Sequence, residues 1–232
     1  MHIQVIGFDA DDTLWHNEPL YTMTEAKFMS LLSPRRPRAE IEAQLYQTEI
    51  RNLDHFGYGI KGFTLSMIET AIELSGGDVT GREIQQIIDY AREMLRAPVE
   101  LLPGVAATVE ALARTHTLML ITKGDLFDQE SKVARSGLAE HFAHVEVVSE
   151  KDKPTYATVL RRRGIDPAAF LMVGNSLRSD ILPVVELGGS AVHIPYVTTW
   201  VHETQHAPLD PARYHTLEHV GLLPALVESL PS

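Results

Sequence analysis

The chain opens with a short apolar segment, residues 3–8, that ends in a dense group of acids, because Asp9, Asp11 and Asp12 follow within four positions. Such a run predicts a strand buried in a parallel sheet, and open α/β sheets bind ligands beyond the carboxyl ends of their strands. Several buried carboxylates are unfavourable without a counter-charge, and hard cations such as Mg²⁺ prefer oxygen ligands. This start therefore favours an α/β fold with a cation site, the alternative being an acidic turn that caps the next element.

The rest of the chain separates into two patterns. Residues 15–98 show no convincing strand and carry apolar residues at helical spacing, whereas from residue 102 strand-like and helix-like segments alternate. Connections of this length predict a parallel sheet with helices on both faces. We therefore expect a Rossmann-like α/β core domain of residues 1–14 and 99–232, interrupted by an all-α domain of residues 15–98.

Apolar periodicity places the individual elements. The four helices of the inserted domain are expected at residues 19–29, 38–54, 63–75 and 80–96. Strands of the core domain are expected at residues 3–8, 117–122, 143–148, 169–173 and 191–194, with a last helix at 217–230.

Composition excludes several classes of protein. The 232 residues carry a formal net charge of −11 and no long basic run, so we expect no nucleic-acid partner, and an anionic substrate needs a local cationic site or a metal. The absence of cysteine excludes disulfides and thiolate metal sites. No apolar run approaches the ~20 residues that cross a bilayer, and Met1 leads into the first strand without a signal-like segment. We expect a cytoplasmic protein with no membrane partner, and the oligomeric state is not predicted.

Asp9, Asp11 and Thr13 form the pattern Asp-x-Asp-x-Thr at the end of the first strand. This string resembles the first motif of the haloacid dehalogenase (HAD) superfamily of phosphohydrolases, and the inserted helices look like its C1-type cap. The resemblance covers the whole chain, through motifs in the core and only through architecture in the cap. It implies a Mg²⁺-dependent phosphohydrolase that cleaves a small phosphomonoester through an aspartyl-phosphate intermediate, with a cap that excludes water when it closes.

The resemblance assigns roles to three residues in the first two motifs. Asp9 matches the nucleophile that forms the aspartyl-phosphate, and Asp11 matches the general acid/base that protonates the leaving oxygen and then activates water. Thr122 ends a core strand as the second motif requires and would hydrogen-bond a phosphate oxygen. Asp12, between two motif positions, is expected to have a structural role.

The third motif supplies a lysine just before a helix, and the chain offers Lys151 and Lys153. The family often has Lys-Pro here, which favours Lys153. Helix-capping chemistry favours Lys151 instead, because Asp152 suits the cap and Pro154 the first turn. Lys151 would then lie in the preceding loop, where a cation can meet both phosphate and Asp9, and we prefer it.

The fourth motif is Gly174-Asn175 followed by Asp180, where the family usually has Gly-Asp and a second Asp. An Asn oxygen can bind Mg²⁺ but contributes no charge. The resemblance therefore implies a shell of Asp9, the Asp11 carbonyl, Asn175 and waters, with Asp180 on the metal or behind a coordinated water.

Several other functions remain open. A 2-haloacid dehalogenase of the same superfamily would use the same nucleophile without a metal, although its members lack an acid at the position of Asp11. A phosphosugar mutase shares the architecture. Outside the superfamily, a phospho-accepting receiver domain is much shorter and carries its Asp after the third strand, and a non-catalytic binding module is supported only by Asn175.

Two further groups of residues are candidate ligand contacts. His202 and His206 are four residues apart and could bind a metal from one helix, but Pro208 and the lack of a third matching ligand argue against it. Tyr58, Lys61 and Phe63 beside a Gly-rich joint are candidate substrate contacts, with a simple linker as the alternative.

Overall fold

The computed structural model describes residues 3–197 and 214–230, and the chain forms two compact units. The α/β unit comprises Met1–Glu18, Val99–Lys123 and Glu130–Ser232, and the helical unit comprises Pro19–Pro98 and Gly124–Gln129. Compared with the expected domains, residues 15–18 join the α/β unit, because Trp15 packs in its core. Residues 124–129 join the helical unit, where Asp125 forms an ion pair with Lys61.

The described residues of the α/β unit form a parallel six-stranded sheet in the order β3-β2-β1-β4-β5-β6. The strands are β1 (Val5–Phe8), β2 (Thr117–Lys123), β3 (His144–Val148), β4 (Phe170–Gly174), β5 (Ser190–His193) and β6 (Tyr214–Thr216). This sheet confirms the expected Rossmann-like class. β6 is not predicted from the sequence, because three residues with no apolar run carry little strand signal.

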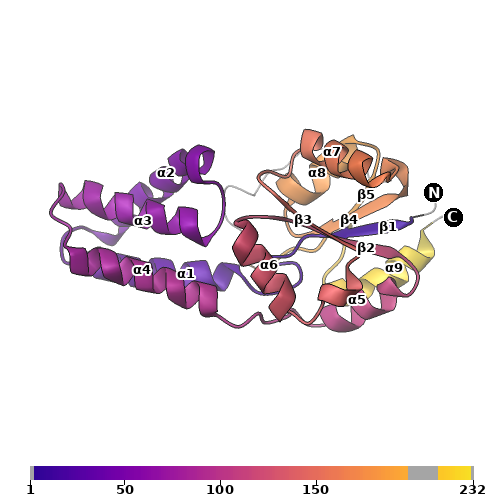
Figure 1. Ribbon diagram of the computed structural model, residues 1–232, viewed down its shortest axis with the longest axis horizontal. Helices are drawn as coiled ribbons and strands as arrows, with labels where there is room; N and C mark the ends of the chain where they lie inside the picture. The colour runs from indigo at the N-terminus through magenta and orange to yellow at the C-terminus, as the bar shows by residue number, and fades with distance from the viewer. Residues whose placement is uncertain (1–2, 198–213, 231–232) are drawn as a thin grey trace. The chain divides into compact units, whose positions relative to one another are not determined.

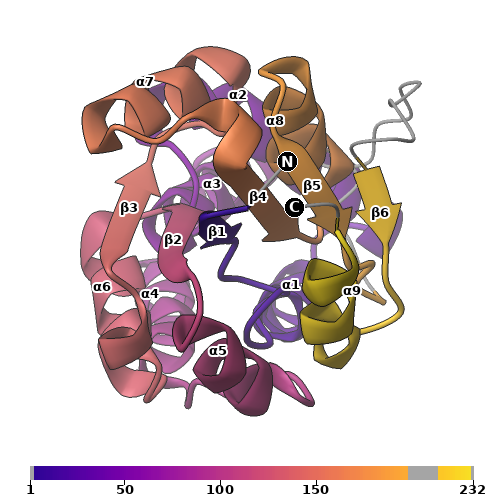
Figure 2. The same cartoon turned by 90° about the vertical axis from the view of Figure 1, so that its right-hand side faces the viewer.

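Helices cover both faces of this sheet, with α7 and α8 on one side and α5 and α9 on the other (Figures 1 and 2). α6 (Leu126–Arg135) begins in the helical unit and continues into the α/β unit, whose other helices are α5 (Val105–Ala113), α7 (Lys153–Arg163), α8 (Leu182–Glu186) and α9 (Leu223–Ser229). The last of these is shorter than the expected helix at 217–230, because a 3₁₀ turn precedes it.

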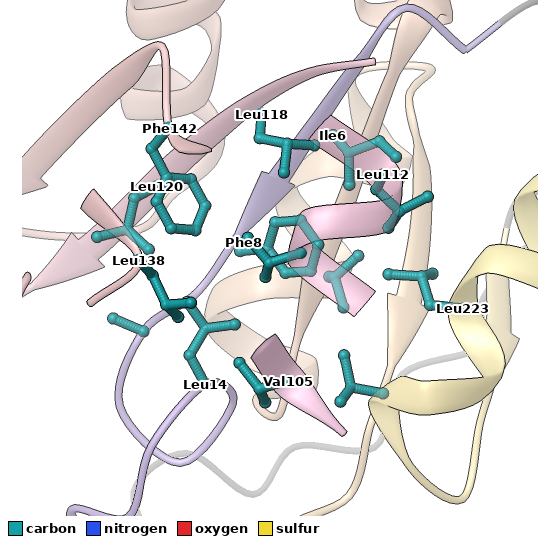
Figure 3. Packing of buried hydrophobic residues seen from close by; sticks show 14 of the residues in the cluster. Ile6, Phe8, Leu14, Val105, Leu112, Leu118, Leu120, Leu138, Phe142 and Leu223 are labelled. Carbon is teal, nitrogen blue, oxygen red and sulfur yellow. The ribbon is translucent and has the colours of Figure 1, made fainter. Parts of the chain in front are cut away.

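Side chains of the strands alternate between two apolar clusters, as the pleat requires. Ile6, Phe8 and Leu120 belong to the cluster that contains residues of α5 and α9, part of which Figure 3 shows. Met119 and Ile121 belong to the cluster that contains residues of α7 and α8. Burial on both faces explains why the strand sequences are continuous apolar runs. Because the strands are parallel, the polar residues that follow them lie at one edge of the sheet.

The helical unit has its own core. Its helices are α1 (Glu18–Leu32), α2 (Arg38–Phe56), α3 (Ile60–Ser75) and α4 (Gly81–Arg96). Each helix contributes at least one fully buried side chain to a single cluster: Phe28, Ile41, Met67 and Ile87. No helix in the described ranges is both long and apolar enough to cross a bilayer.

Candidate active site

The loop after β1 presents Asp9 at the carboxyl edge of the sheet. The Asp9 backbone N–H donates to Val173 O of the neighbouring β4 at 2.9 Å, so the residue still follows the strand register. The loop then turns back, with Leu14 N donating to Ala10 O at 2.8 Å, and the Leu14 side chain is buried in the core. Within this turn the Thr13 hydroxyl donates to Asp9 Oδ2 at 2.7 Å and thereby orients the carboxylate.

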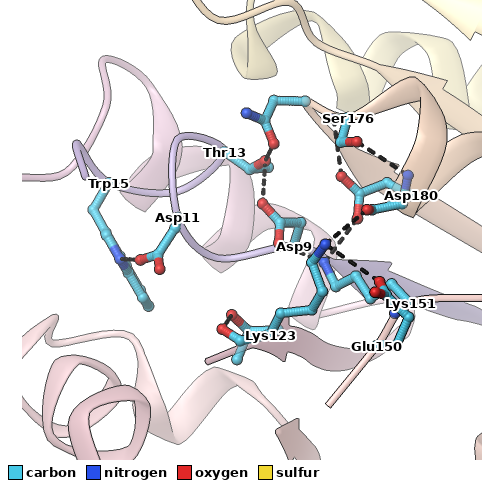
Figure 4. A network of polar contacts seen from close by, with 12 residues as sticks. Asp9, Asp11, Thr13, Trp15, Lys123, Glu150, Lys151, Ser176 and Asp180 are labelled. Carbon is cyan, nitrogen blue, oxygen red and sulfur yellow. Dashed lines mark hydrogen bonds and ion pairs between the residues drawn. The ribbon is translucent and has the colours of Figure 1, made fainter. Parts of the chain in front are cut away.

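Lys151 joins two of the predicted acids. Its Nζ lies 2.5 Å from Asp9 Oδ1 and 2.7 Å from Asp180 Oδ1, and all three side chains are buried (Figure 4). Lys153 instead lies at the surface, 3.7 Å from Glu186. The reason is the one expected from helix capping, because Asp152 accepts a hydrogen bond from Thr155 N at 2.9 Å and so leaves Lys151 in the loop before α7.

Asp180 is held by the turn that follows β4. Its Oδ2 accepts a hydrogen bond from Ser176 N at 3.0 Å, and its Oδ1 faces Lys151. The turn is a π-helical segment, Leu177–Ile181, which runs directly into α8. Pro183 lies in the first turn of α8. It has no backbone N–H, so it cannot donate the hydrogen bond to the preceding turn that an ordinary α-helix would contain. This local widening places Asp180 against the end of β4.

Gly174 is required by this close packing rather than by a special backbone conformation. A Cβ built at Gly174 would lie 2.2 Å from Asp180 Oδ2, well inside van der Waals contact. The missing side chain at Gly174 therefore makes room for the Asp180 carboxylate.

We expect Gly174→Ala to lower the free energy of unfolding by about 1–3 kcal/mol, as overpacked cores do, and to displace Asp180. Urea unfolding checks this expectation. Gly81→Ala is the matched control, because a Cβ there meets nothing within 4 Å, and alanine favours the start of α4. A Gly174→Ala variant as stable as the wild type would contradict the expectation.

The electrostatics of this cluster follow from burial and from one shared cation. Burial raises the pKa of Asp9 to about 7, and the negative Asp180 adds to the rise, while Lys151 opposes it. Burial by itself lowers the pKa of Lys151, but the charges of Asp180 and Asp9 outweigh burial and raise it. One ammonium group therefore lies between two buried carboxylates.

The donor atoms around Asp9 fit a hard cation. Asp9 and Asp180 offer carboxylate oxygens, and Asn175 Oδ1 lies 3.4 Å from the Thr13 hydroxyl that binds Asp9. The Asn175 backbone carbonyl is engaged elsewhere, 3.0 Å from His193 Nε2. Among the described residues no group of three or more His, Cys, Asp or Glu side chains is arranged for a metal, so this set depends on the Asn175 amide. His202 and His206 lie outside the described residues.

Asp11 is held apart from the Asp9–Lys151–Asp180 cluster. Figure 4 shows its carboxylate beside the indole of Trp15, whose Nε1 donates to Asp11 Oδ1 at 2.7 Å. Lys132 Nζ lies 3.0 Å from both carboxylate oxygens of Asp11. The structure thus brings Asp9, Lys151 and Asp180 together and places the Asp11 carboxylate in a second, adjoining group.

Thr122 and Lys123 end β2 at the same edge of the sheet. Thr122 is buried and its hydroxyl donates to the Lys123 carbonyl at 3.3 Å. Lysine side chains are mostly exposed in folded proteins, but only 13% of the Lys123 side chain is exposed. Its Nζ contacts Ser179 Oγ at 3.0 Å and Glu150 Oε1 at 3.4 Å, which ties β2 to the loops that carry Asp180 and Lys151.

Asp12 has the structural role that its position suggests. Its φ of 62° is left-handed, a conformation that Asp and Asn tolerate better than most residues. Its carboxylate accepts hydrogen bonds from Asn17 N at 2.9 Å and Glu18 N at 3.0 Å, at the start of α1. Burial raises the pKa of Asp12 to about 6, and these backbone donors only partly oppose it.

This pKa predicts a pH-dependent loss of stability. The folded protein holds the Asp12 proton up to about pH 6, whereas the unfolded chain releases it near pH 3.8. The stabilisation is therefore complete below pH 3.8 and is lost as pH rises through 6. Asp12→Asn cannot titrate, so the wild type should lose about 1–3 kcal/mol relative to the variant across this window. Parallel pH profiles of urea unfolding for the two proteins would contradict this expectation.

Sequence reasoning missed Lys132 and Trp15, which hold Asp11. Lys132 lies on the buried face of α6 with Asp128, Gln129 and Val133. Their spacing marks one helix face, but a mainly polar face cannot be distinguished from a solvated one by periodicity alone. The signal that could have found Lys132 is chemical, because a parallel α/β edge with several acids needs cations nearby.

A parallel α/β sheet with buried acids, a lysine and a threonine at its carboxyl edge defines a protein that acts on a ligand at that edge. A family model for haloacid dehalogenase-like hydrolases matches residues 3–188. The chain belongs to this family and is therefore a hydrolase.

Solved structures agree with this assignment. A haloacid dehalogenase-like hydrolase from Xanthomonas campestris is 44% identical, with 98% of this chain and 91% of that chain covered and a TM-score of 0.87. A 2-haloacid dehalogenase from Pseudomonas syringae pv. tomato is 25% identical, with coverages of 97% and 98% and a TM-score of 0.63. The Bacillus subtilis HAD-hydrolase YfnB, bound to magnesium, is 16% identical, with coverages of 98% and 100% and a TM-score of 0.68. The last likeness shows the fold alone.

The matched structures include proteins described as phosphatases and others described as 2-haloacid dehalogenases. A search of curated proteins finds no match. The family assignment therefore leaves the reaction itself to be inferred from the site.

Proposed function

We propose that the protein is a cytoplasmic, Mg²⁺-dependent phosphohydrolase that cleaves a small phosphomonoester through an aspartyl-phosphate. The observation that carries the proposal is the arrangement around Asp9, whose buried carboxylate contacts Lys151 and Thr13 and lies next to the oxygen donors of Asn175 and Asp180. A carboxylate in this setting is oriented for attack, and a cation beside it can neutralise a phosphate.

In the proposed reaction Asp9 attacks phosphorus, and the bond from phosphorus to the ester oxygen breaks. Asp11, which must be protonated when the substrate binds, gives its proton to that oxygen, which leaves as an alcohol. Asp11 then takes a proton from water, which attacks the aspartyl-phosphate, releases phosphate and restores Asp9. Lys151 and Thr122 hold the phosphoryl oxygens throughout.

Magnesium, when bound, would neutralise charge on the phosphoryl group. Asp9, the Asp11 carbonyl and Asn175 would hold it, with Asp180 bound directly or through water. The support is the hard-oxygen character of this set and the excess of buried negative charge over the single Lys151. The magnesium bound in the B. subtilis relative is in keeping with this choice.

A second candidate is 2-haloacid dehalogenation, favoured by the 25% identity to the P. syringae enzyme. That reaction would use the Asp9–Lys151 pair against carbon and needs no acid at position 11. The presence of Asp11, two residues after Asp9, supports phosphoester cleavage instead, because an alkoxide leaving group needs a proton and a halide does not.

The test is phosphate release from a broad panel of phosphomonoesters, with Mg²⁺ or with EDTA, run beside halide release from 2-haloacids. We expect Mg²⁺-dependent phosphate release and no halide release. Halide release in EDTA without phosphate release would replace the proposal by the second candidate, and the best ester would identify the substrate class.

A further inference from the structure

Lys132 is a buried lysine outside the Asp9–Lys151–Asp180 cluster. It lies on α6 and is 6% exposed. Its Nζ donates to Asp11 Oδ1 and Oδ2, each at 3.0 Å, and to Asn17 Oδ1 at 2.9 Å. These three oxygens match the three N–H donors of an ammonium group.

This arrangement is more than an ordinary surface ion pair. Exposed pairs contribute little to stability, whereas a buried ammonium group is unfavourable unless its donors are satisfied. Asp11 Oδ1 also accepts the Trp15 indole N–H at 2.7 Å, so two donors on different elements fix this carboxylate. The Asp11 side chain therefore has a defined place in the folded protein.

We propose that Lys132 is a positioning residue for Asp11, which it holds in place for proton transfer to the leaving-group oxygen. The inference rests on the phosphohydrolase function proposed above. Lys132 contacts the Asp11 carboxylate directly, so it would act on the leaving group through Asp11. Its contact with Asn17 offers the competing explanation, in which Lys132 only braces the loop before α1.

The leaving group separates these two explanations. A 4-nitrophenolate ion leaves without a proton, whereas an alkoxide needs one, so a misplaced general acid slows alkyl esters selectively. A loosened loop slows both kinds of ester. The experiment compares kcat for 4-nitrophenyl phosphate with kcat for the best alkyl phosphate of the panel, in the wild type, Lys132→Met, Lys132→Arg, Asp11→Asn and the double variant Asp11→Asn/Lys132→Met.

We expect Lys132→Met to lower kcat for the alkyl ester about 100-fold, within the range of general acid catalysis, and for the aryl ester less than about 5-fold. Lys132→Arg retains charge and donors and should restore part of the alkyl activity. In the Asp11→Asn background Lys132→Met should have no further effect, because both changes remove one function. Lys153→Met, which removes a surface lysine, controls for the loss of one positive charge and should match the wild type.

Equal losses on the two esters, an unchanged kcat, or a full additional loss in the Asp11→Asn background would overturn the inference. Far-UV circular dichroism identifies variants that fail to fold, and Lys132→Gln replaces Lys132→Met in that case. A wild type that releases phosphate from no ester would instead reject the phosphohydrolase function, and the inference with it.

Discussion

Asp9→Asn should abolish phosphate release, with kcat at least about a thousandfold below that of the wild type, as for the loss of other covalent nucleophiles. The amide has nearly the shape of the carboxylate and can still accept the hydrogen bond from the Thr13 hydroxyl. It cannot form an aspartyl-phosphate. The measurement is phosphate release from the best ester of the panel in saturating Mg²⁺.

The control for Asp9→Asn is its thermal unfolding midpoint. Burial raises the pKa of Asp9 to about 7, so the charged carboxylate is disfavoured in the folded protein. A neutral amide should therefore leave the midpoint unchanged or raise it, and the loss of activity cannot then come from unfolding. Phosphate release above about a tenth of the wild-type rate would show that Asp9 is not the nucleophile.

Lys151→Met should be the most destabilising single change in the site. It removes the cation that lies 2.5 Å from Asp9 and 2.7 Å from Asp180, and it leaves two buried carboxylates facing each other. Breaking a buried pair in this way costs about 3–5 kcal/mol, which urea unfolding at pH 8 would measure. Phosphate release should fall as well, because the proposed phosphate-binding cation is gone.

Lys153→Met provides the matched control for this change. Half of the Lys153 side chain is exposed and its distance to Glu186 is 3.7 Å, so its loss should change the free energy of unfolding by less than about 0.5 kcal/mol. If Lys151→Met were equally mild, the two carboxylates would have to be protonated or hydrated in the folded protein. Lys151 would then not be the group that stabilises the buried carboxylates of Asp9 and Asp180.

The parts of the fold and site that could be predicted are those with strong local signals. The apolar run that becomes β1 and the acids after it fix the sheet edge at which Asp9 lies. Asp152 and Pro154 at the start of α7 predict that Lys151, and not Lys153, lies in the loop, and the structure places both lysines accordingly. Their catalytic roles remain predictions.

The parts that could not be predicted depend on contacts between distant segments. Nothing local in α6 indicates that Lys132 meets Asp11, which lies more than a hundred residues earlier. Lys123 looks like a surface residue because its partners, Glu150 and Ser179, come from two other loops. The reason for Gly174 was also hidden, because the carboxylate that occupies its missing Cβ position belongs to the following turn.

The central position of β1 in the sheet also has a consequence for folding during synthesis on the ribosome. β1 is synthesised before both of its neighbours, because its Val5 pairs with Thr117 on one side and with Phe170 on the other. At ordinary translation speeds the second partner emerges on the order of ten seconds later. Most of the helical unit is contiguous, Pro19–Pro98, and can collapse in that interval. The β1 segment is therefore synthesised well before its neighbours, and the loop after β1 can adopt its final structure only once β4 has been made.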